Sequence, residues 1–172
     1  IESNKKLAKA VEKKTENRNK LLDKKAFTIS GNPKKTYLPP KRLSLVPDFD
    51  FTPLDESHKR LEASAWKYEK ALAGVKKGFL SAEHKSQVNQ LLREVEQAMT
   101  RSDGLPRRKW FKNMIYAPGF YTGYGVKTLP GIREGLEERN WDETHFYILE
   151  VAKALDRAAA KINAAADILK AS

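Results

Sequence analysis

Apolar residues recur at intervals of three and four over most of the chain, and this spacing predicts four long amphipathic helices. The first is expected within residues 1–26. The second begins at Thr52, where Thr-Pro-Leu-Asp supplies an N-cap, a first-turn proline and a capping box. Ser81 can cap the third helix and Asp142 the fourth. The chain therefore has the helix starts and the apolar stripes of a helical bundle.

The second and fourth helices have the clearest apolar faces. In the fourth, small residues separate larger ones, and alanines allow neighbouring helices to approach closely. The expected stripe of the second helix is Leu54, His58, Leu61, Ala65, Tyr68, Leu72 and Val75. The expected stripe of the fourth is Ile148, Ala152, Leu155, Ala159, Ile162, Ala166 and Leu169.

The predicted fold is all-α. Four helices with short or structured connections favour an antiparallel bundle, because each stripe must be buried against the others. No strand-like alternation and no internal repeat is visible. With 172 residues, 40% of them hydrophobic, the chain can bury one core and is expected to form a single domain over residues 1–172.

A segment rich in proline, residues 27–51, follows the first helix, and residues 52–172 make up the remainder of the bundle. The prolines of residues 27–51 keep that segment extended, but the segment is too apolar to be a free linker. We therefore expect it to lie against the bundle or against a neighbour, as an insertion. The chain also begins at Ile1 without a methionine, which suggests a fragment of a larger protein.

A long loop rich in glycine, proline and aromatic residues separates the third and fourth long helices. Loops of this length inside helical domains are uncommon and are often functional. Pro130 can start a short helix within it that runs through Leu136. Its motifs are Gly104-Leu105-Pro106, Ile115-Tyr116-Ala117-Pro118, Gly123-Tyr124-Gly125 and Leu129-Pro130-Gly131-Ile132.

The formal charge of +11 favours binding to polyanions, and two basic segments could provide the binding surface. The lysines between Lys5 and Lys25 are interleaved with carboxylates, as on a solvated helix face. The segment Arg107–Lys112 mixes cations with aromatics, but Trp110 and Phe111 can equally anchor the loop to the bundle. The anchor interpretation is favoured and nucleic acid is not expected as a partner. A basic adaptor that binds nucleic acid or anionic membrane stays as the alternative.

Residues for catalysis or metal binding are not grouped in this sequence. The absence of cysteine excludes disulfides, thiolate metal sites and a cysteine nucleophile. His58, His84 and His145 are isolated, with no second ligand at metal-binding spacing. No run of about 18 apolar residues is present, so no direct membrane contact is expected. We predict a non-catalytic chain that carries no metal or cofactor of its own.

The loop motifs, in this order and followed by an alanine-rich helix, resemble the C-terminal helical domain of the transferrin receptor and glutamate carboxypeptidase II family, the transferrin receptor-like dimerisation domain. The resemblance implies a homodimer partner and a peptidase-like domain in the same parent chain, with zinc in that domain. The parent is then a zinc metallocarboxypeptidase or an inactive homologue. It also implies a membrane-anchored parent, with this domain on the extracytoplasmic or lumenal side.

The resemblance further implies a role for the loop. In the carboxypeptidases of this family, the loop after Ile-Tyr-Ala-Pro reaches the peptidase site, where a Lys-Tyr pair binds the carboxylate of the substrate's C-terminal glutamate. Here Tyr124 matches the tyrosine, but Gly123 takes the place of the lysine, which removes a charge-assisted contact worth about 1.5–3 kcal/mol. Lys127 could replace that cation through a different loop path, and Tyr121 is a further candidate. We expect Tyr116 to Gly125 to line a substrate cleft or its remnant.

Overall fold

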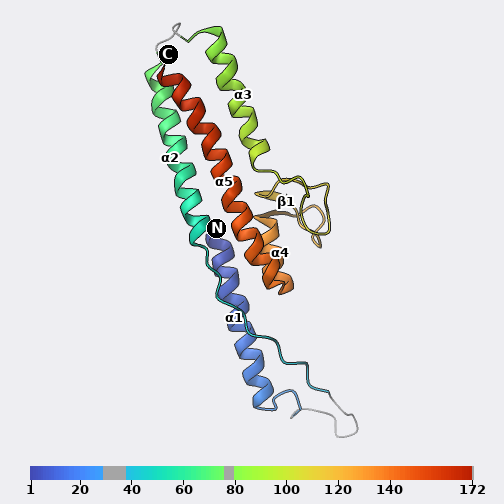
Figure 1. Ribbon diagram of the computed structural model, residues 1–172. Helices are drawn as coiled ribbons and strands as arrows, with labels where there is room; N and C mark the ends of the chain where they lie inside the picture. The colour runs from blue at the N-terminus through green and yellow to red at the C-terminus, as the bar shows by residue number, and fades with distance from the viewer. Residues whose placement is uncertain (29–37, 76–79, 172) are drawn as a thin grey trace.

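The computed structural model describes residues 1–28, 38–75 and 80–171. Within these residues the regular secondary structure is helical apart from one short hairpin, so the predicted all-α class is confirmed (Figure 1). The elements are α1 (Glu2–Asp23), α2 (Thr52–Gly74), α3 (Ala82–Ala98), β1 (Tyr116–Pro118), β2 (Val126–Thr128), α4 (Pro130–Glu138) and α5 (Trp141–Lys170).

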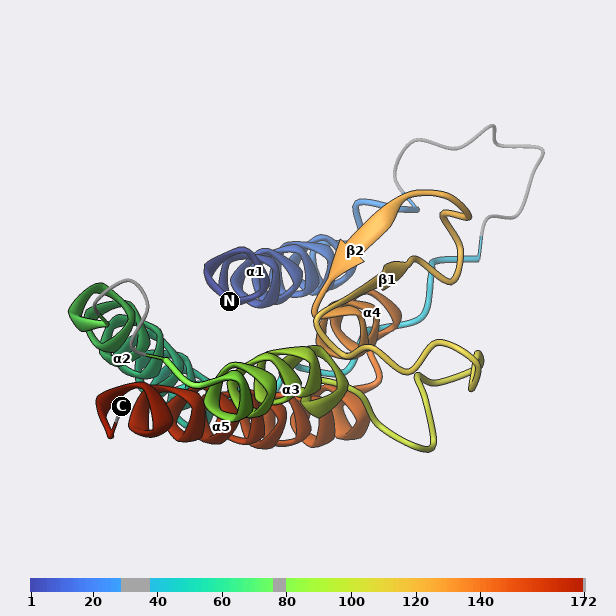
Figure 2. The ribbon, with the colours of Figure 1, turned by 90° about the horizontal axis from the view of Figure 1, so that it is seen from above.

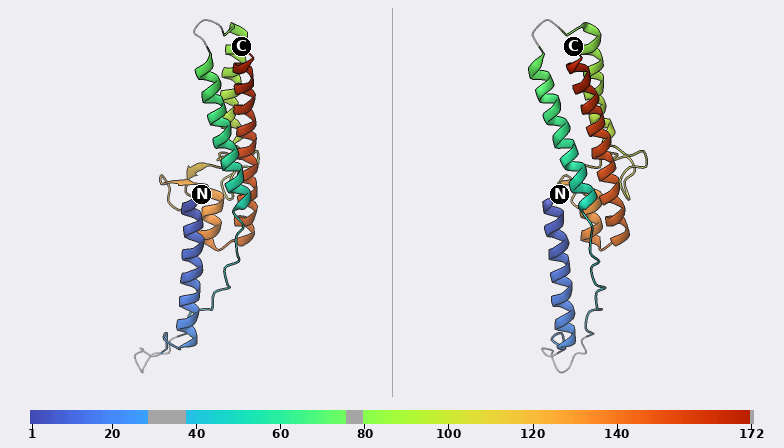
Figure 3. Two further views of the ribbon diagram at one scale, coloured as in Figure 1. Left: turned by 90° about the vertical axis from the view of Figure 1, so that its left-hand side faces the viewer. Right: turned by 60° about the vertical axis from the view of Figure 1, so that its left-hand side comes forward.

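The long helix α5 is the centre of the fold and contacts α2, α3 and α4. It runs parallel to α2, because ion pairs join Arg60 to Asp156 and Lys67 to Asp167 in the same order along both helices. Helix α3 runs antiparallel to α5 (Figures 1 and 3), and so does the short helix α4, in which Gly131 lies against Tyr147 and Gly135 against Thr144. The predicted antiparallel arrangement is therefore wrong for α2 and α5. The long loop and α4 return the chain to the start of α2 before α5 begins.

Helix α1 lies outside the bundle of α2, α3 and α5, so the prediction of four helices packed together is also wrong. It contacts α4 and extends beyond the start of α2 (Figures 1 and 3). Seen along the bundle, α1 and the hairpin lie on the same side of α5 (Figure 2). The residues that α1 buries are polar, which suits contacts with backbone better than an apolar seam between helices. They are Asn4, Thr15 and Asn19.

Residues 38–51 form an extended strap beside α1 (Figure 1). Asn19 clamps it, because the amide nitrogen of its side chain donates to the Leu43 carbonyl at 2.9 Å and its oxygen accepts from the Leu43 N–H at 3.1 Å. Phe49 and Phe51 then enter the core. The prediction was that this segment lies against the bundle or against a neighbour; this holds at its end, where Phe49 and Phe51 are buried, whereas Leu38 and Leu45 are exposed. Residues 29–37 of the predicted segment lie outside the described residues.

The helix starts were predicted with mixed success. Ser81 caps α3 as expected, and Pro130 begins α4. Thr52 is the first residue of α2 and not its N-cap, and its N–H donates to the Asp50 carboxylate at 2.9 Å. Asn140, two residues before Asp142, caps α5. Both errors place the cap too late in the sequence by one or two residues.

Within the described residues, two apolar clusters make up the core. The larger lies where the start of α2, the loop after α3, α4 and the first half of α5 meet. There α4 approaches α5 so closely that a Cβ on Gly131 would lie 2.4 Å from the Tyr147 ring. The smaller cluster lies at the far end of the bundle and consists of Ala71, Val88, Ala165, Ala166 and Leu169.

The buried face of α2 is displaced by about one residue from the predicted stripe. The predicted members His58 and Leu72 are exposed. Small side chains face α5 in their place, because the alanines of α5 bring the two helices close together. The buried residues of α2 are Leu54, Ser57, Ser64 and Ala71.

Candidate functional site

The loop after α3 contains an antiparallel hairpin that the sequence pattern did not predict. In the register of β1 and β2, Ala117 lies opposite Lys127. Each strand has three residues, which is too short for an alternating pattern to be recognised. The N–H of Gly119 donates to the Gly125 carbonyl at 2.8 Å and closes the end of the hairpin. We call residues 119–125 the hairpin tip.

The hairpin tip presents its tyrosines to solvent. Tyr124 is fully exposed, and Tyr121 is largely exposed beside the ring of Phe120. Within the described part of the chain, the Tyr124 hydroxyl has no hydrogen-bond partner. Gly123 adopts a φ of 57° in open space, a conformation that suits glycine. The tip can therefore offer tyrosine side chains to a neighbouring surface.

Lys127, the other candidate, is buried against α4. Its ammonium pairs with Glu137 and lies 4.0 Å from Glu134. Burial opposes the charge on Glu137, but hydrogen bonds from Lys127 and Arg133 outweigh it and hold the pKa of Glu137 below its usual range. The structure thus brings Tyr121, Gly123 and Tyr124 together at the tip and directs the Lys127 ammonium to α4.

A buried ion pair lies beneath the hairpin tip, between Arg108 and Glu134. Their side chains are 3% and 1% exposed. Two nitrogens of Arg108 donate to the two oxygens of Glu134 at 2.7 and 2.9 Å, and the Phe120 N–H donates to the same carboxylate at 2.8 Å. Sequence reasoning missed Glu134. The signal that could have revealed it is a charged residue among the buried positions of the short helix α4.

The other members of the predicted basic patch behave differently from one another. Arg107 donates to both carboxylate oxygens of Glu143 at 3.0 Å, which raises the pKa of Arg107. Phe111 packs against the larger core cluster, as the anchor interpretation predicts. That interpretation is wrong for Trp110, which is 73% exposed. Arg107 and Arg108 both pair with carboxylates, so the exposed Lys109 and Lys112 are the cations of this patch left to attract a polyanion.

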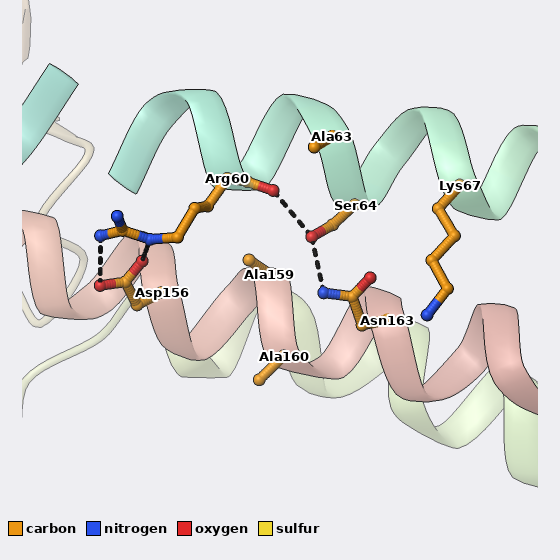
Figure 4. Close-up of a pocket in the computed structure, with 8 residues that line it drawn as sticks. All are labelled: Arg60, Ala63, Ser64, Lys67, Asp156, Ala159, Ala160 and Asn163. Carbon is orange, nitrogen blue, oxygen red and sulfur yellow. Dashed lines mark hydrogen bonds and ion pairs between the residues drawn. The ribbon is translucent and has the colours of Figure 1, made fainter. Parts of the chain in front are cut away.

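A second candidate surface is a groove of about 510 Å³ between α2 and α5 (Figure 4). One hydrogen bond crosses between the two helices here, from the Asn163 amide to the Ser64 hydroxyl at 2.9 Å, and that hydroxyl donates in turn to the Arg60 carbonyl of its own helix at 2.8 Å. Ion pairs border the groove and alanines lie between them. The lining residues are Arg60, Ala63, Ser64, Lys67, Asp156, Ala159, Ala160 and Asn163.

This groove continues toward the start of α2. An adjoining hollow of about 300 Å³ shares Arg60 and Asp156 with it and is also lined by Pro53 and Leu149. Leu149 on α5 is about half exposed. The α2–α5 face therefore combines small side chains, which permit close approach, with an exposed leucine side chain.

The histidines do not form a metal site. In residues 1–28, 38–75 and 80–171, no group of three or more histidine, aspartate or glutamate side chains is placed to hold a metal ion. His58 lies 3.5 Å from Glu62, and the His145 ring lies 3.4 Å from the Asp48 carbonyl and contacts the Phe49 ring at a tilt. Among the described helices, none has the length and apolar character needed to cross a membrane.

Comparison with known proteins identifies the family of the region that holds the hairpin tip and the groove between α2 and α5. Residues 49–163 match the family described as transferrin receptor-like dimerisation domain, which confirms the resemblance seen in the loop motifs. A protein of Arabidopsis thaliana named probable glutamate carboxypeptidase is 32% identical over 79 residues, 42% of this chain and 12% of that protein. One of the same name from Arthroderma benhamiae is 27% identical over 124 residues, 72% of this chain and 17% of that protein. The chain thus spans only a small part of the length of these relatives.

Proposed function

Since this chain belongs to the transferrin receptor-like dimerisation domain family, we propose that it is a non-catalytic helical domain that joins two copies of its parent protein. The observation that supports this proposal is the groove between α2 and α5 (Figure 4). Its exposed alanines, Ala63 and Ala160, allow a helix of a second copy to approach the backbone closely. The exposed methyl groups of Leu149, in the adjoining hollow, provide apolar area for such an interface to cover.

Sedimentation equilibrium of this chain over a concentration series tests the proposal. We expect a reversible dimer whose affinity is the same at low and physiological salt. Ala160→Glu places a charge in the groove and should weaken association at least about tenfold, since an unpaired buried charge is costly. Ala82→Glu, the same change at an exposed position at the start of α3, is the matched control and should leave association unchanged.

Two results would contradict this assignment. If the chain stays monomeric at every concentration, this domain does not self-associate on its own. If Ala160→Glu and Ala82→Glu leave the dimer equally strong, the interface lies away from the groove. An affinity for polyanions that falls steeply with salt would instead favour the basic adaptor as the function.

We further propose that the hairpin tip lines the substrate cleft of a peptidase-like domain in the same parent chain. The support is the exposure of Tyr121 and Tyr124, together with relatives that are named as probable glutamate carboxypeptidases. Residues 119–125 contain no basic side chain, and the Lys127 ammonium pairs with α4. In this proposal the tip therefore supplies tyrosine contacts, and a cation for a substrate carboxylate comes from another part of the parent.

Tyr124→Phe in the full-length parent tests the role of the tip. Removal of a hydroxyl that donates to a charged group should weaken the affinity for a peptide ending in glutamate about tenfold. Tyr147→Phe is the matched control, because the Tyr147 side chain is buried and its hydroxyl donates to the Gly104 carbonyl at 3.3 Å within this chain. Equal peptide affinity in the Tyr124→Phe variant and the unaltered parent would argue against a cleft role.

A further inference from the structure

The hairpin tip is held by a contact from outside the hairpin. Its own backbone supplies two bonds, from the Gly119 N–H to the Gly125 carbonyl at 2.8 Å and from the Gly125 N–H to the Thr122 carbonyl at 3.2 Å. The N–H of Phe120, next to the exposed tyrosines, donates instead to the Glu134 carboxylate on α4 at 2.8 Å. The direction in which the tip leaves the molecule thus depends on a helix side chain.

The Glu134 carboxylate is the meeting point of three segments of the loop. Arg108 comes from the turn before the hairpin, Phe120 from the tip and Lys127 from β2. All three present donors or positive charge to one carboxylate, and hydrogen bonds to an ionised acceptor are the stronger kind. A single buried charge therefore fixes the relative positions of the three segments.

The Phe120 side chain is fixed at the same place. The guanidinium carbons of Arg107 and Arg108 lie 5.5 and 5.9 Å from the centre of its ring, within the range of cation–π attraction. Space at the neighbouring residue is tight, since a Cβ on Gly119 would lie 2.2 Å from the Thr122 hydroxyl oxygen. Both the backbone and the ring of Phe120 are thus constrained from below.

We infer that Glu134 is the positioning residue of the hairpin tip: it anchors Phe120 and so sets the direction in which Tyr121 and Tyr124 project. A buried ion pair is a weak source of stability compared with apolar residues of the same volume, so stability alone does not account for the pair with Arg108. The effect of Glu134 on substrate binding rests on the proposed function of the tip, whereas its effect on the direction of the tip does not.

The test is amide hydrogen exchange of this chain, followed by NMR. The double variant Arg108→Met with Glu134→Leu replaces the ion pair by apolar side chains and should preserve the fold. We expect the Phe120 amide to exchange at least about tenfold faster, since the carboxylate that accepts its hydrogen bond is gone, while the Val151 amide in the middle of α5 is unchanged. Glu94→Gln removes another paired carboxylate, the partner of Lys161 at 2.6 Å, and should leave both amides unchanged.

Unchanged exchange at Phe120 in the double variant would overturn the inference, as would equal acceleration in Glu94→Gln. If the double variant loses the α5 protection as well, Glu134→Gln is the second test. It keeps an acceptor oxygen without the charge and should accelerate the Phe120 amide while sparing Val151; no selective acceleration would overturn the inference.

A measurement on the full-length parent separates this inference from the proposed cleft. The double variant should weaken the affinity for a peptide ending in glutamate severalfold if the tip lines the cleft. A faster Phe120 amide with unchanged peptide affinity supports the positioning role and removes the cleft role. Weaker peptide affinity without a faster Phe120 amide would overturn the positioning role and leave the cleft role standing.

Discussion

The contact between α2 and α5 and the loop that leads to α4 both hold the backbone in one place, but they use different contacts. Between the helices, small side chains pack tightly, and Ala165 and Ala166 of α5 are fully buried. In the loop, the Arg108–Glu134 ion pair holds separate segments in position. Tight packing between helices is sensitive to the volume of the packed side chains and insensitive to charges elsewhere. The ion pair can be replaced by apolar side chains only if both charges are removed together. The two regions should therefore respond differently to the same kinds of substitution.

The largest effect is expected when one partner of the buried pair is removed. Glu134→Leu alone should lower the free energy of unfolding by about 3–5 kcal/mol, because it leaves the Arg108 guanidinium buried without a counter-charge. The double variant with Arg108→Met should recover most of that loss. Urea unfolding of the two variants and the unaltered chain measures both values. Equal losses in the single and double variants would show that volume, not charge, governs the loop.

The helix contact should instead be sensitive to volume. Ala165→Leu adds three carbons at a position with no exposed surface and should cost about 1–3 kcal/mol of unfolding free energy. Ala164→Leu, the same change at the adjacent exposed residue, should stay within about 0.5 kcal/mol. Thermal unfolding of both variants makes the comparison, and equal midpoints would contradict tight packing at this contact.

Two glycines allow a smaller test of the same contrast. Gly74→Ala, in the last turn of α2, meets nothing within 4 Å and should stabilise the chain by about 0.4–1 kcal/mol by restricting the unfolded state. Gly131→Ala, where α4 contacts α5, should destabilise it, because the new methyl group would overlap the Tyr147 ring. Chemical denaturation gives the sign of each change. Two changes of the same sign would contradict the close approach at α4.

The smallest effect is a pH dependence confined to the base of the hairpin. The pKa of Glu137 is lower in the folded chain than in the unfolded one, so its contribution is complete at neutral pH and is lost as the pH falls from about 5 through the folded-state pKa. Because Glu137 is partly exposed, the contribution should stay below about 1 kcal/mol. The difference in stability between the chain and Glu137→Gln should shrink with falling pH. The cost of Ala165→Leu should not change over the same range.

Much of the helical framework followed from the sequence because periodicity reports which face is buried. The stripe of α5 was predicted in this way, and Ile148, Ala152 and Leu155 are in the core. The method failed for α2 by about one residue. It favoured the larger side chains at His58 and Leu72, whereas the partner helix required small ones, and the shape of the partner is not encoded in the stripe of α2 itself.

The sequence indicated that the loop is structured but not how its segments contact one another. Its glycines and prolines marked where the chain turns, and the family motifs identified Tyr124 as the residue to examine. The partner of Arg108 lies 26 residues away on α4, and no local pattern relates the two. Trp110 and Phe111 had the same local signal, yet only Phe111 is packed in the core. Contacts of this kind depend on the path of the backbone and become visible only with the fold.

The clamp on the strap has a consequence for how this chain can vary between related proteins. Asn19 binds the backbone of residue 43 and not its side chain, so many side chains are compatible with that position. The number of residues from there to Phe49 is a different matter, since both ends are anchored, one on α1 and the other in the core. Insertions and deletions in relatives that keep Asn19 should therefore avoid residues 43–49, while substitutions at residue 43 itself should be frequent.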